Sequence, residues 1–412
     1  MMSAMDLAAI SMLTSGEGWG LLQSLPPYDE ARAMSLQGRL REAGFAPELV
    51  AAALTQSRLR GRAREKFGGF ADGMLFTDDG LEQATRLAVA ARHAERFRRA
   101  GVHVVHDLGC GIGADAMGFA GLDLGVRAVD VDEVSAAVAA VNLRHWSAAR
   151  VEHGRAEEVR LPAGEAARHT GAWLDPSRRL RGAADITGRS RRVFSLAGIS
   201  PSWEQVCEVA RRLPATGAKL SPSFPHRAVP PGAEAQWTSW EGEVLECGLW
   251  WGPLAQTRGR SAAVCRADRS THIVTEAQAA GARPPLRDVG DLGSWLYEPD
   301  RAVIRAGLTG ALVRAVDGAE LDVGVGYVSG DRVVELGWAR RFGVLEVMPY
   351  NVKALRAWLR DHDVGRVTIK KRGVPIDPDG LRRALRCRGA AGATLVLTRI
   401  RSQPHVVVVR AA

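Results

Sequence analysis

The chain has 412 residues, of which 46% are hydrophobic and 25% are charged. This length allows two or three domains, and this composition is typical of a globular protein rather than of a disordered or fibrous one. The net charge of +9 favours polyanionic partners without identifying one.

Several features of the sequence argue against whole classes of protein. No apolar run approaches the roughly 18 residues that a membrane-spanning helix needs, so we expect no membrane partner. The five cysteines include no CxxC pair, so we expect neither a bound metal nor a disulfide framework. The first residues lack a basic segment followed by a long apolar core, so we expect no signal peptide and a cytoplasmic location.

Residues 1–100 are predicted to form a helical N-terminal segment, because apolar residues recur there at helical spacing. Thr77, followed by Asp78 and Asp79, is typical of a helix start, since acids stabilise the first turn of a helix. One helix is predicted to run from this start through Ala84, Leu87, Ala88 and Ala91 to Gly101, which ends it.

Residues 101–268 are predicted to form a doubly wound α/β domain, since apolar strands and helices alternate along them as in parallel βαβ units. The end of this segment differs, because two apolar runs flank Glu241-Gly242-Glu243, which is a hairpin signal. We therefore expect a parallel sheet that ends in an antiparallel hairpin. The predicted parallel strands cover residues 102–107, 126–130, 150–153, 171–174, 193–196 and 215–220.

Residues 290–412 are predicted to form a small α+β domain after a polar linker that contains Pro284-Pro285. Helical and strand patterns alternate in this region and end in two strands. The expected strands lie near residues 303–305, 332–336, 344–347, 367–373, 394–398 and 406–409, and the expected helices cover about 351–362 and 377–387.

The most informative motif is DLGCGIG at residues 107–113, which follows an apolar strand. Its glycines let the backbone approach a ligand closely, because no Cβ intervenes. The next apolar strand ends in Asp130, whose carboxylate can accept two hydrogen bonds from a ribose diol. This arrangement predicts an adenosine-containing cofactor. Gly109, Gly111 and Ala114 also satisfy the dinucleotide pattern GxGxxA, so the glycines alone leave the choice of cofactor open.

At this motif the chain resembles the class I S-adenosylmethionine-dependent methyltransferases, whose DxGxGxG pattern matches residues 107–113 and whose ribose-binding acid matches Asp130. Dinucleotide folds usually carry an apolar residue where Asp107 stands, whereas an acid there can bind the methionine amino group of S-adenosylmethionine. The resemblance implies a Rossmann-like methyltransferase sheet, this cofactor and methyl transfer. The residues expected to hold the cofactor are Asp107, Gly109, Cys110, Gly111, Gly113, Asp130, Val131, Ala156 and Glu157.

The third motif departs from the family's pattern. Where relatives often have an acid that receives the adenine amino group, this chain has Arg155. A guanidinium group cannot accept that hydrogen bond. We expect Glu157 or the backbone around Ala156 to replace the acid, or adenine to be held mainly by stacking and shape.

The fourth motif is Asp175-Pro176-Ser177-Arg178, which follows the fourth predicted strand and resembles the (D/N)PP(Y/F/R) loop of nucleic-acid methyltransferases. In that role Asp175 would hold the N–H of the accepting nitrogen and offset its developing positive charge, and Pro176 would fix the turn. Arg178 could bind phosphate. Ser177 and Arg178 replace the second proline and the aromatic residue, which removes a stacking partner for a base.

The last domain is basic, with Lys370-Lys371-Arg372 at a strand end and several arginines on the helix that follows. Residues 341–355 and 369–378 resemble the THUMP-like C-terminal domain of a group of bacterial class I methyltransferases. The resemblance implies that structured RNA, such as tRNA or rRNA, is docked there and methylated on a base. Two alternatives remain open: a methyltransferase for a small molecule or a protein, and a cofactor-binding protein without turnover.

Overall fold

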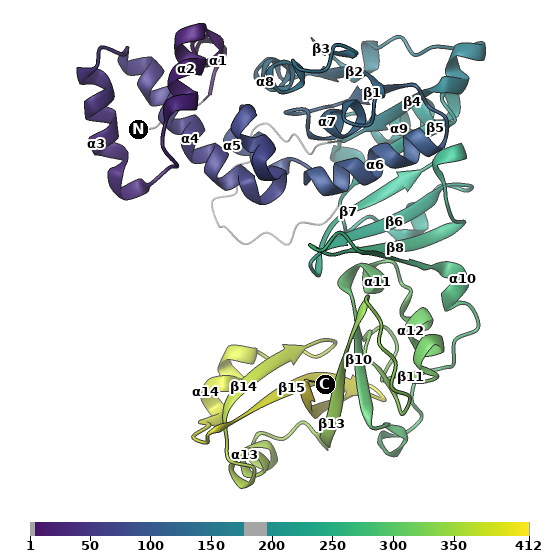
Figure 1. The fold of residues 1–412 in the computed structure, drawn as a ribbon. Coiled ribbons are helices and arrows are strands. Elements are labelled where there is room, and N and C mark those ends of the chain that lie inside the picture. The colour runs from purple at the N-terminus through teal and green to yellow at the C-terminus, as the bar shows by residue number, and fades with distance from the viewer. Residues whose placement is uncertain (1–4, 177–195, 412) are drawn as a thin grey trace. The chain divides into compact units, whose positions relative to one another are not determined.

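A computed structural model describes residues 5–176 and 196–411, and Figure 1 shows the course of the chain. The chain divides into two compact units. The first consists of Met1–Leu220 and Leu249–Gln256, and the second of Ser221–Gly248 and Thr257–Ala412. Within the described residues, no helix is both long enough and apolar enough to cross a membrane.

Residues 5–99 are mainly helical, as predicted. The helix start expected at Thr77 is confirmed, because the Thr77 hydroxyl accepts a hydrogen bond from the Gly80 N–H at 2.9 Å. The prediction of one continuous helix is wrong, because residues 84–86 are not helical and separate the helices Asp78–Gln83 and Leu87–Arg99. Gly101, with φ of 73°, follows the second of them. The helices of this segment are α1 (Leu7–Thr14), α2 (Gly16–Ser24), α3 (Glu30–Glu42), α4 (Pro47–Phe67), α5 (Asp78–Gln83) and α6 (Leu87–Arg99).

The parallel sheet of the first unit has the order β3-β2-β1-β4-β5. Every neighbouring pair in this order is parallel, and the order reverses between β1 and β4. In such doubly wound sheets, ligands bind outside the carboxyl ends of the strands at this switch point. The elements are β1 (Val104–Leu108), α7 (Ala114–Ala120), β2 (Gly125–Asp130), α8 (Glu133–Leu143), β3 (Ala149–His153), β4 (Thr170–Leu174), α9 (Trp203–Arg212) and β5 (Ala215–Leu220).

One predicted strand of this sheet, over residues 193–196, falls almost entirely outside the described residues. Its last residue, Leu196, begins the short 3-10 turn Leu196–Gly198. The other five predicted parallel strands match β1 to β5 within a few residues.

The predicted hairpin is confirmed as β6 (Glu234–Trp240) and β7 (Glu243–Trp250). Its two turn residues, Glu241 and Gly242, both have positive φ, as a tight two-residue turn requires. Two further strands follow the hairpin, in the order β7-β6-β8-β9. These are β8 (Gly259–Cys265), parallel to β6, and β9 (Thr271–Thr275), antiparallel to β8.

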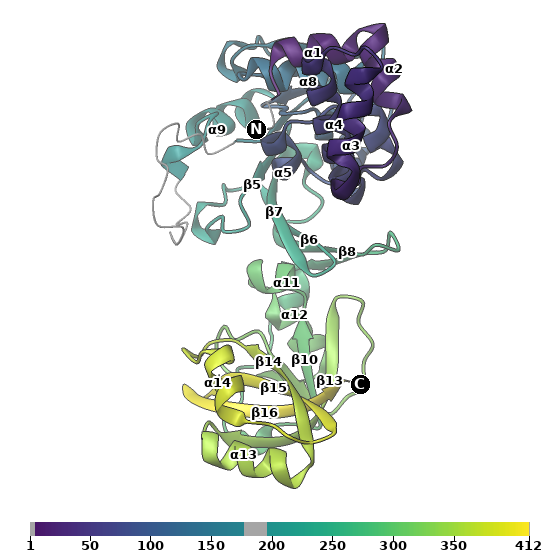
Figure 2. The same ribbon diagram turned by 90° about the vertical axis from the view of Figure 1, so that its left-hand side faces the viewer.

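The second unit also contains a seven-stranded sheet with the order β11-β12-β10-β13-β16-β15-β14. Leucines of α13 and α14 pack with Leu395, Leu397 and Val406 of β15 and β16, so both helices cover one face of the sheet. Figure 2 shows these helices with β14, β15 and β16. The elements are β10 (Trp295–Pro299), α11 (Arg301–Arg305), α12 (Thr309–Val316), β11 (Ala319–Glu320), β12 (Val328–Gly330), β13 (Ala339–Pro349), α13 (Val352–Asp361), β14 (Val364–Lys371), α14 (Pro378–Leu385), β15 (Ala391–Ile400) and β16 (Gln403–Ala411).

Two strand predictions in this unit are wrong. Residues 303–305 belong to α11, because Asp300 caps the helix by accepting a hydrogen bond from the Ala302 N–H at 2.9 Å. Residues 332–336 form no strand. From β13 onward, the order of strands and helices is the predicted one.

Candidate functional site

The turn between β1 and α7 needs its glycines. Gly109, Gly111 and Gly113 have φ values of 95°, 54° and 84°, in a region that other residues rarely adopt. The Gly109 and Cys110 N–H groups donate to the Val129 carbonyl at 2.9 and 3.0 Å, which joins the turn to β2. Burial raises the pKa of the Cys110 thiol, so this residue is placed to contribute its backbone rather than a reactive thiolate.

Asp107 lies in β1 immediately before the turn and is 1% exposed. Among the described residues, neither of its carboxyl oxygens has a hydrogen-bond partner. Burial raises the pKa of Asp107 well above its ordinary value, and the carboxylates of Asp115, Asp175 and Asp130 raise it further. A buried polar group without a partner costs about 1–3 kcal/mol, which makes Asp107 a candidate for binding a cationic ligand group.

Asp130, at the end of β2, has a structural role that the sequence did not indicate. Its carboxylate accepts hydrogen bonds from the Gly111 N–H at 2.8 Å and from the Asp132 N–H at 2.9 Å. It therefore holds the glycine turn in place. A carboxylate has about four acceptor positions, so this role is compatible with a ribose contact. Val131, directly after it, exposes 43% of its surface, which leaves an apolar side chain accessible beside the turn.

Asp175 is brought to the same place from β4. Its carbonyl oxygen lies 3.4 Å from the position that a Cβ on Gly109 would occupy, so the two backbones approach closely. Its carboxylate forms an ion pair with Lys219 of β5, with Oδ2 and Nζ 2.5 Å apart. Pro176 follows Asp175 at this end of the strand, whereas Ser177 and Arg178 lie outside the described residues.

A buried polar network continues from Lys219 into the first unit. The Lys219 ammonium donates to the Thr85 hydroxyl at 3.0 Å, and that hydroxyl donates to Asp115 at 2.7 Å. His93 Nδ1 lies 2.8 Å from the other Asp115 oxygen. Although burial alone would raise the pKa of Asp115, these hydrogen bonds and the charges of His93 and Lys219 lower it.

Sequence reasoning assigned no role to Lys219, Thr85, His93 or Asp115. Three of them stand in separate segments before or after the glycine turn, and only the fold brings them together. One signal was available for Lys219: the chain has only five lysines among its 55 basic residues.

The charges around the turn distinguish the two classes of cofactor. Asp107, Asp115, Asp130 and Asp175 lie close enough for their charges to interact, and Lys219 is the cation among them. Asp115 occupies the first turn of α7, where a dinucleotide would place its pyrophosphate. This concentration of acids repels phosphate and attracts a cation. The residues therefore fit S-adenosylmethionine, which carries a sulfonium and an ammonium group, better than a dinucleotide.

The residues expected near adenine are arranged around a short turn after β3. Ala156 and Glu157 lie in the 3-10 turn Ala156–Glu158. The Glu157 carboxylate forms an ion pair with Arg155, with an Nε–Oε2 distance of 3.6 Å. Within the two described segments, no group of His, Cys, Asp and Glu side chains could hold a metal ion.

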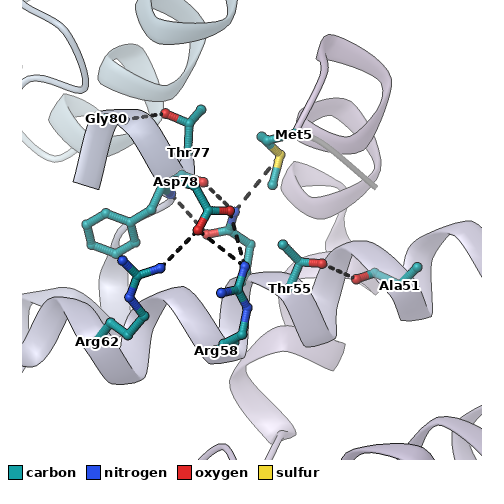
Figure 3. Close-up of polar contacts among 10 residues, drawn as sticks. Met5, Ala51, Thr55, Arg58, Arg62, Thr77, Asp78 and Gly80 are labelled. Carbon is teal, nitrogen blue, oxygen red and sulfur yellow. Dashed lines mark hydrogen bonds and ion pairs between the residues drawn. The ribbon is translucent and has the colours of Figure 1, made fainter. Parts of the chain in front are cut away.

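The helix α5 packs directly against the glycine turn. A Cβ on Gly80 would lie 2.4 Å from Ile112 Cγ2, so only glycine permits this approach. Figure 3 shows how α4 holds α5, through Arg58 and Arg62, whose guanidinium groups lie 3.1 and 2.9 Å from the Asp78 carboxylate. The N-terminal helices α4 and α5 therefore support the glycine turn.

The basic run on β14 is largely paired inside the second unit. Lys370 Nζ and Arg372 Nη2 lie 2.6 and 3.2 Å from the Glu298 carboxylate of β10. The Arg372 guanidinium also lies over the Tyr327 ring, 4.5 Å from its centroid. Of the three predicted phosphate-binding residues on this strand, Lys371 is the exposed one.

Comparisons with known proteins agree with this geometry. Residues 339–411 match the family model "THUMP domain-like", and residues 6–63 match a domain of unknown function (DUF8688). Uncharacterized S-adenosylmethionine-dependent methyltransferases of two Mycobacterium tuberculosis strains, CDC 1551 / Oshkosh and H37Rv, are 34% identical over 372 residues, which is 88% of this chain and 95% of theirs.

A solved structure supports the same fold. A protein from Porphyromonas gingivalis W83, described as a methyltransferase, superposes with a TM-score of 0.71 at 18% identity. The match covers 94% of this chain and 100% of that protein.

Proposed function

Because the chain belongs to the family of S-adenosylmethionine-dependent methyltransferases, we propose that it methylates a base in structured RNA that its THUMP-like domain, residues 290–412, docks. The observation that carries the catalytic part is the close approach of Asp175 to the glycine turn, beside the buried and unpartnered Asp107. The two acids stand at the carboxyl ends of adjacent strands, where this class of sheet binds its ligands.

The cofactor residues divide into three groups by position. Asp107 binds the methionine ammonium group, since this buried carboxyl has no other partner among the described residues. Asp130 would bind the ribose, and Val131, which is exposed, would pack against the adenine ring. The turn residues Gly109, Cys110, Gly111 and Gly113 contribute backbone, and Ala156 and Glu157 flank adenine.

Bound S-adenosylmethionine would supply its sulfonium methyl group: an N–C bond would form between the acceptor nitrogen and the methyl carbon as the C–S bond breaks in line, with its electron pair staying on sulfur and S-adenosylhomocysteine leaving. Asp175 accepts a hydrogen bond from the N–H of that nitrogen and offsets the positive charge that develops there. The proton leaves afterwards from the methylated nitrogen to water. Pro176 restricts the backbone after Asp175 and so fixes the direction of its carbonyl group.

The charge distribution supports RNA as the acceptor. Residues 339–411 contain 16 Lys and Arg but only 5 Asp and Glu, a net charge of +11, so the rest of the chain, at +9 overall, carries −2. The positive charge is therefore concentrated in the segment that matches the THUMP-like family. Concentrated positive charge is what phosphate contacts require.

The helices α13 and α14 provide the docking surface within this segment. Lys353, Arg356, Arg383 and Arg386 are exposed on these two helices and at the end of α14. Arg356 donates to the Ala384 carbonyl, which places the charges of the two helices side by side. Lys370 and Arg372, by contrast, are held by Glu298. We therefore assign phosphate docking to the helical face and not to the β14 run.

The test uses the full chain, S-adenosylmethionine with a labelled methyl group, and RNA from a strain that lacks this gene. We expect label in one RNA fraction and binding of that RNA that weakens steeply with salt. Replacing Arg383 and Arg386 by Ala should weaken RNA binding at least tenfold and reduce the salt slope by about 1.5 to 2. Arg211→Ala with Arg212→Ala is the matched control, since this exposed pair ends α9, before β5 and away from its carboxyl end.

Other outcomes identify the alternatives. Label in a small-molecule or protein fraction, with none in RNA, would show that RNA is not the acceptor. Cofactor binding without transfer to any fraction would indicate a protein without turnover. Equal loss of RNA binding in the two arginine-pair variants would remove the docking role from α13 and α14.

A further inference from the structure

Lys219 of β5 lies among four acids, which are Asp107 of β1, Asp115 of α7, Asp130 of β2 and Asp175 after β4. Its Nζ lies 2.5 Å from Asp175 Oδ2 and 3.0 Å from the Thr85 hydroxyl oxygen. Its side chain is 16% exposed, so water screens these contacts only partly. The pair therefore acts as one unit.

We propose that Lys219 is a positioning residue of methyl transfer, whose ammonium group keeps the Asp175 carboxylate ionised and in a fixed orientation toward the methyl acceptor. This inference rests on the proposed role of Asp175. It adds a residue and a function that neither the glycine motif nor the Asp-Pro loop contains.

The need for such a cation follows from the surrounding charges. Asp107 lies close enough to Asp175 for their charges to interact, and neighbouring carboxylates favour the protonated form of one another. A protonated Asp175 would donate a hydrogen bond where the acceptor N–H needs an oxygen that accepts one. An adjacent ammonium group opposes this protonation, because an opposite charge favours the ionised carboxylate.

Lysine suits this position better than arginine does. An ammonium group is a compact point charge, whereas a guanidinium is a planar fork that needs more room. The chain uses lysine for only five of its 55 basic residues, and one of them is at this position. We therefore expect the Lys219→Arg variant to retain only part of the rate of methyl transfer.

A chain of further hydrogen bonds holds the Lys219 ammonium group. The Thr85 hydroxyl accepts from Lys219 and donates to Asp115, and Asp115 is bound on its other side by His93. The His93 ring packs 4.5 Å from Trp173 and 5.6 Å from Trp250, measured between ring centroids. The Lys219 ammonium group, held by this supporting layer, therefore has little freedom to turn away from the Asp175 carboxylate.

The test is a double-substitution cycle on the rate of methyl transfer in a single turnover, with protein in excess over RNA. Asp175→Asn and Lys219→Met should each lower the rate by about 100-fold, and the double variant should be no slower than Asp175→Asn alone. Lys219→Met should bind S-adenosylmethionine at least as tightly as the natural protein, because it removes a cation near a cationic ligand. A defect in folding would instead weaken cofactor binding.

Thr85 provides an independent variant that leaves the ion pair in place. Thr85→Val removes the hydroxyl at nearly constant shape and should lower the rate of methyl transfer about tenfold. Thr85→Ser keeps the hydroxyl and should keep the natural rate. This pair keeps the inference testable even where Lys219→Met does not fold.

A spectroscopic readout needs no methyl acceptor. In protein labelled with ¹⁵N-lysine, there are only five side-chain ammonium groups to distinguish. We expect the Lys219 signal, identified by its loss in Lys219→Met, to persist at neutral pH because the ion pair slows proton exchange, and to disappear in Asp175→Asn.

The outcomes separate the two proposals. A natural rate in Asp175→Asn would overturn the proposed role of Asp175 and the inference with it. A large loss in Asp175→Asn with a natural rate in Lys219→Met would overturn the inference alone. Additive losses in the double variant, or a Lys219 signal unchanged in Asp175→Asn, would show that Lys219 does not act through Asp175.

Discussion

Two acids, one in each unit, have opposite surroundings: Asp107 is buried, and the Glu298 side chain is 15% exposed. Asp107 of β1 has no hydrogen-bond partner among the described residues, whereas Glu298 of β10 is bound by Lys370 and Arg372 and lies 3.3 Å from the Tyr327 hydroxyl. An unsatisfied buried acid costs stability, and a paired one need not. The comparison supports the proposal that Asp107 binds a ligand, whereas Glu298 stabilises the fold.

The same comparison changes the interpretation of the basic residues in the two units. In the sequence, Lys370-Lys371-Arg372 is a conspicuous basic run, and Lys219 is a single lysine in an apolar strand. In the structure, two members of the run are paired with Glu298, whereas Lys219 stands beside the proposed catalytic Asp175. Local charge density in the sequence was therefore a poor guide to where charge is used.

The largest effect is expected from Asp107→Asn. The substitution keeps the shape of the side chain and removes its charge, so S-adenosylmethionine should bind about 100-fold more weakly, which corresponds to about 2.7 kcal/mol. The free energy of unfolding without cofactor should rise, because the amide need not take up a proton to be buried. Calorimetric titration and urea unfolding measure the two quantities.

Asp115→Asn is the control for this prediction. Asp115 is equally buried, but His93 and Thr85 bind its carboxylate, and its pKa is lowered rather than raised. Removing its charge should therefore lower the free energy of unfolding. If both variants lost stability, the contrast between an unpartnered and a partnered acid would be wrong.

The next largest effect is expected from Glu298→Ala. Removing one member of a buried ion pair costs about 3–5 kcal/mol, and the partners here are about a quarter exposed, so we expect about 2–3 kcal/mol. Urea unfolding measures this loss, and cofactor affinity should stay unchanged. Glu346→Ala is the control, because that exposed glutamate should contribute less than about 0.5 kcal/mol. Equal stability of the two variants would contradict the structural role of Glu298.

Much of the first unit could be predicted from the sequence because its signals are local. The three glycines, the acid before them and the acid that ends the next strand lie within 24 residues, and periodicity places them on two strands and a turn. The hairpin at Glu241-Gly242 was predictable for the same reason, since its turn residues and its two strands are adjacent in sequence.

The missed features depend on contacts between distant residues. Thr85, Asp115 and Lys219 meet only after the strands have assembled in their order. Residues 303–305 are too few to show a clear period in the sequence, and the cap at Asp300 starts a helix there. The pairing of Lys370 with Glu298 joins residues 72 positions apart, which no local pattern could indicate.

The smallest of these effects is the pH dependence that Asp107 imposes. Burial and nearby acids raise its pKa in the folded protein, so between the unfolded and the folded pKa values the folded protein binds more protons than the unfolded chain. The free energy of unfolding should therefore fall as pH rises through this window, by at most about 1.4 kcal/mol per pH unit from this group. Cofactor binding should release a proton and strengthen with pH, by at most about tenfold per unit. Both slopes, measured in the free protein, should flatten in Asp107→Asn, and slopes that persist there would assign the titration to another group.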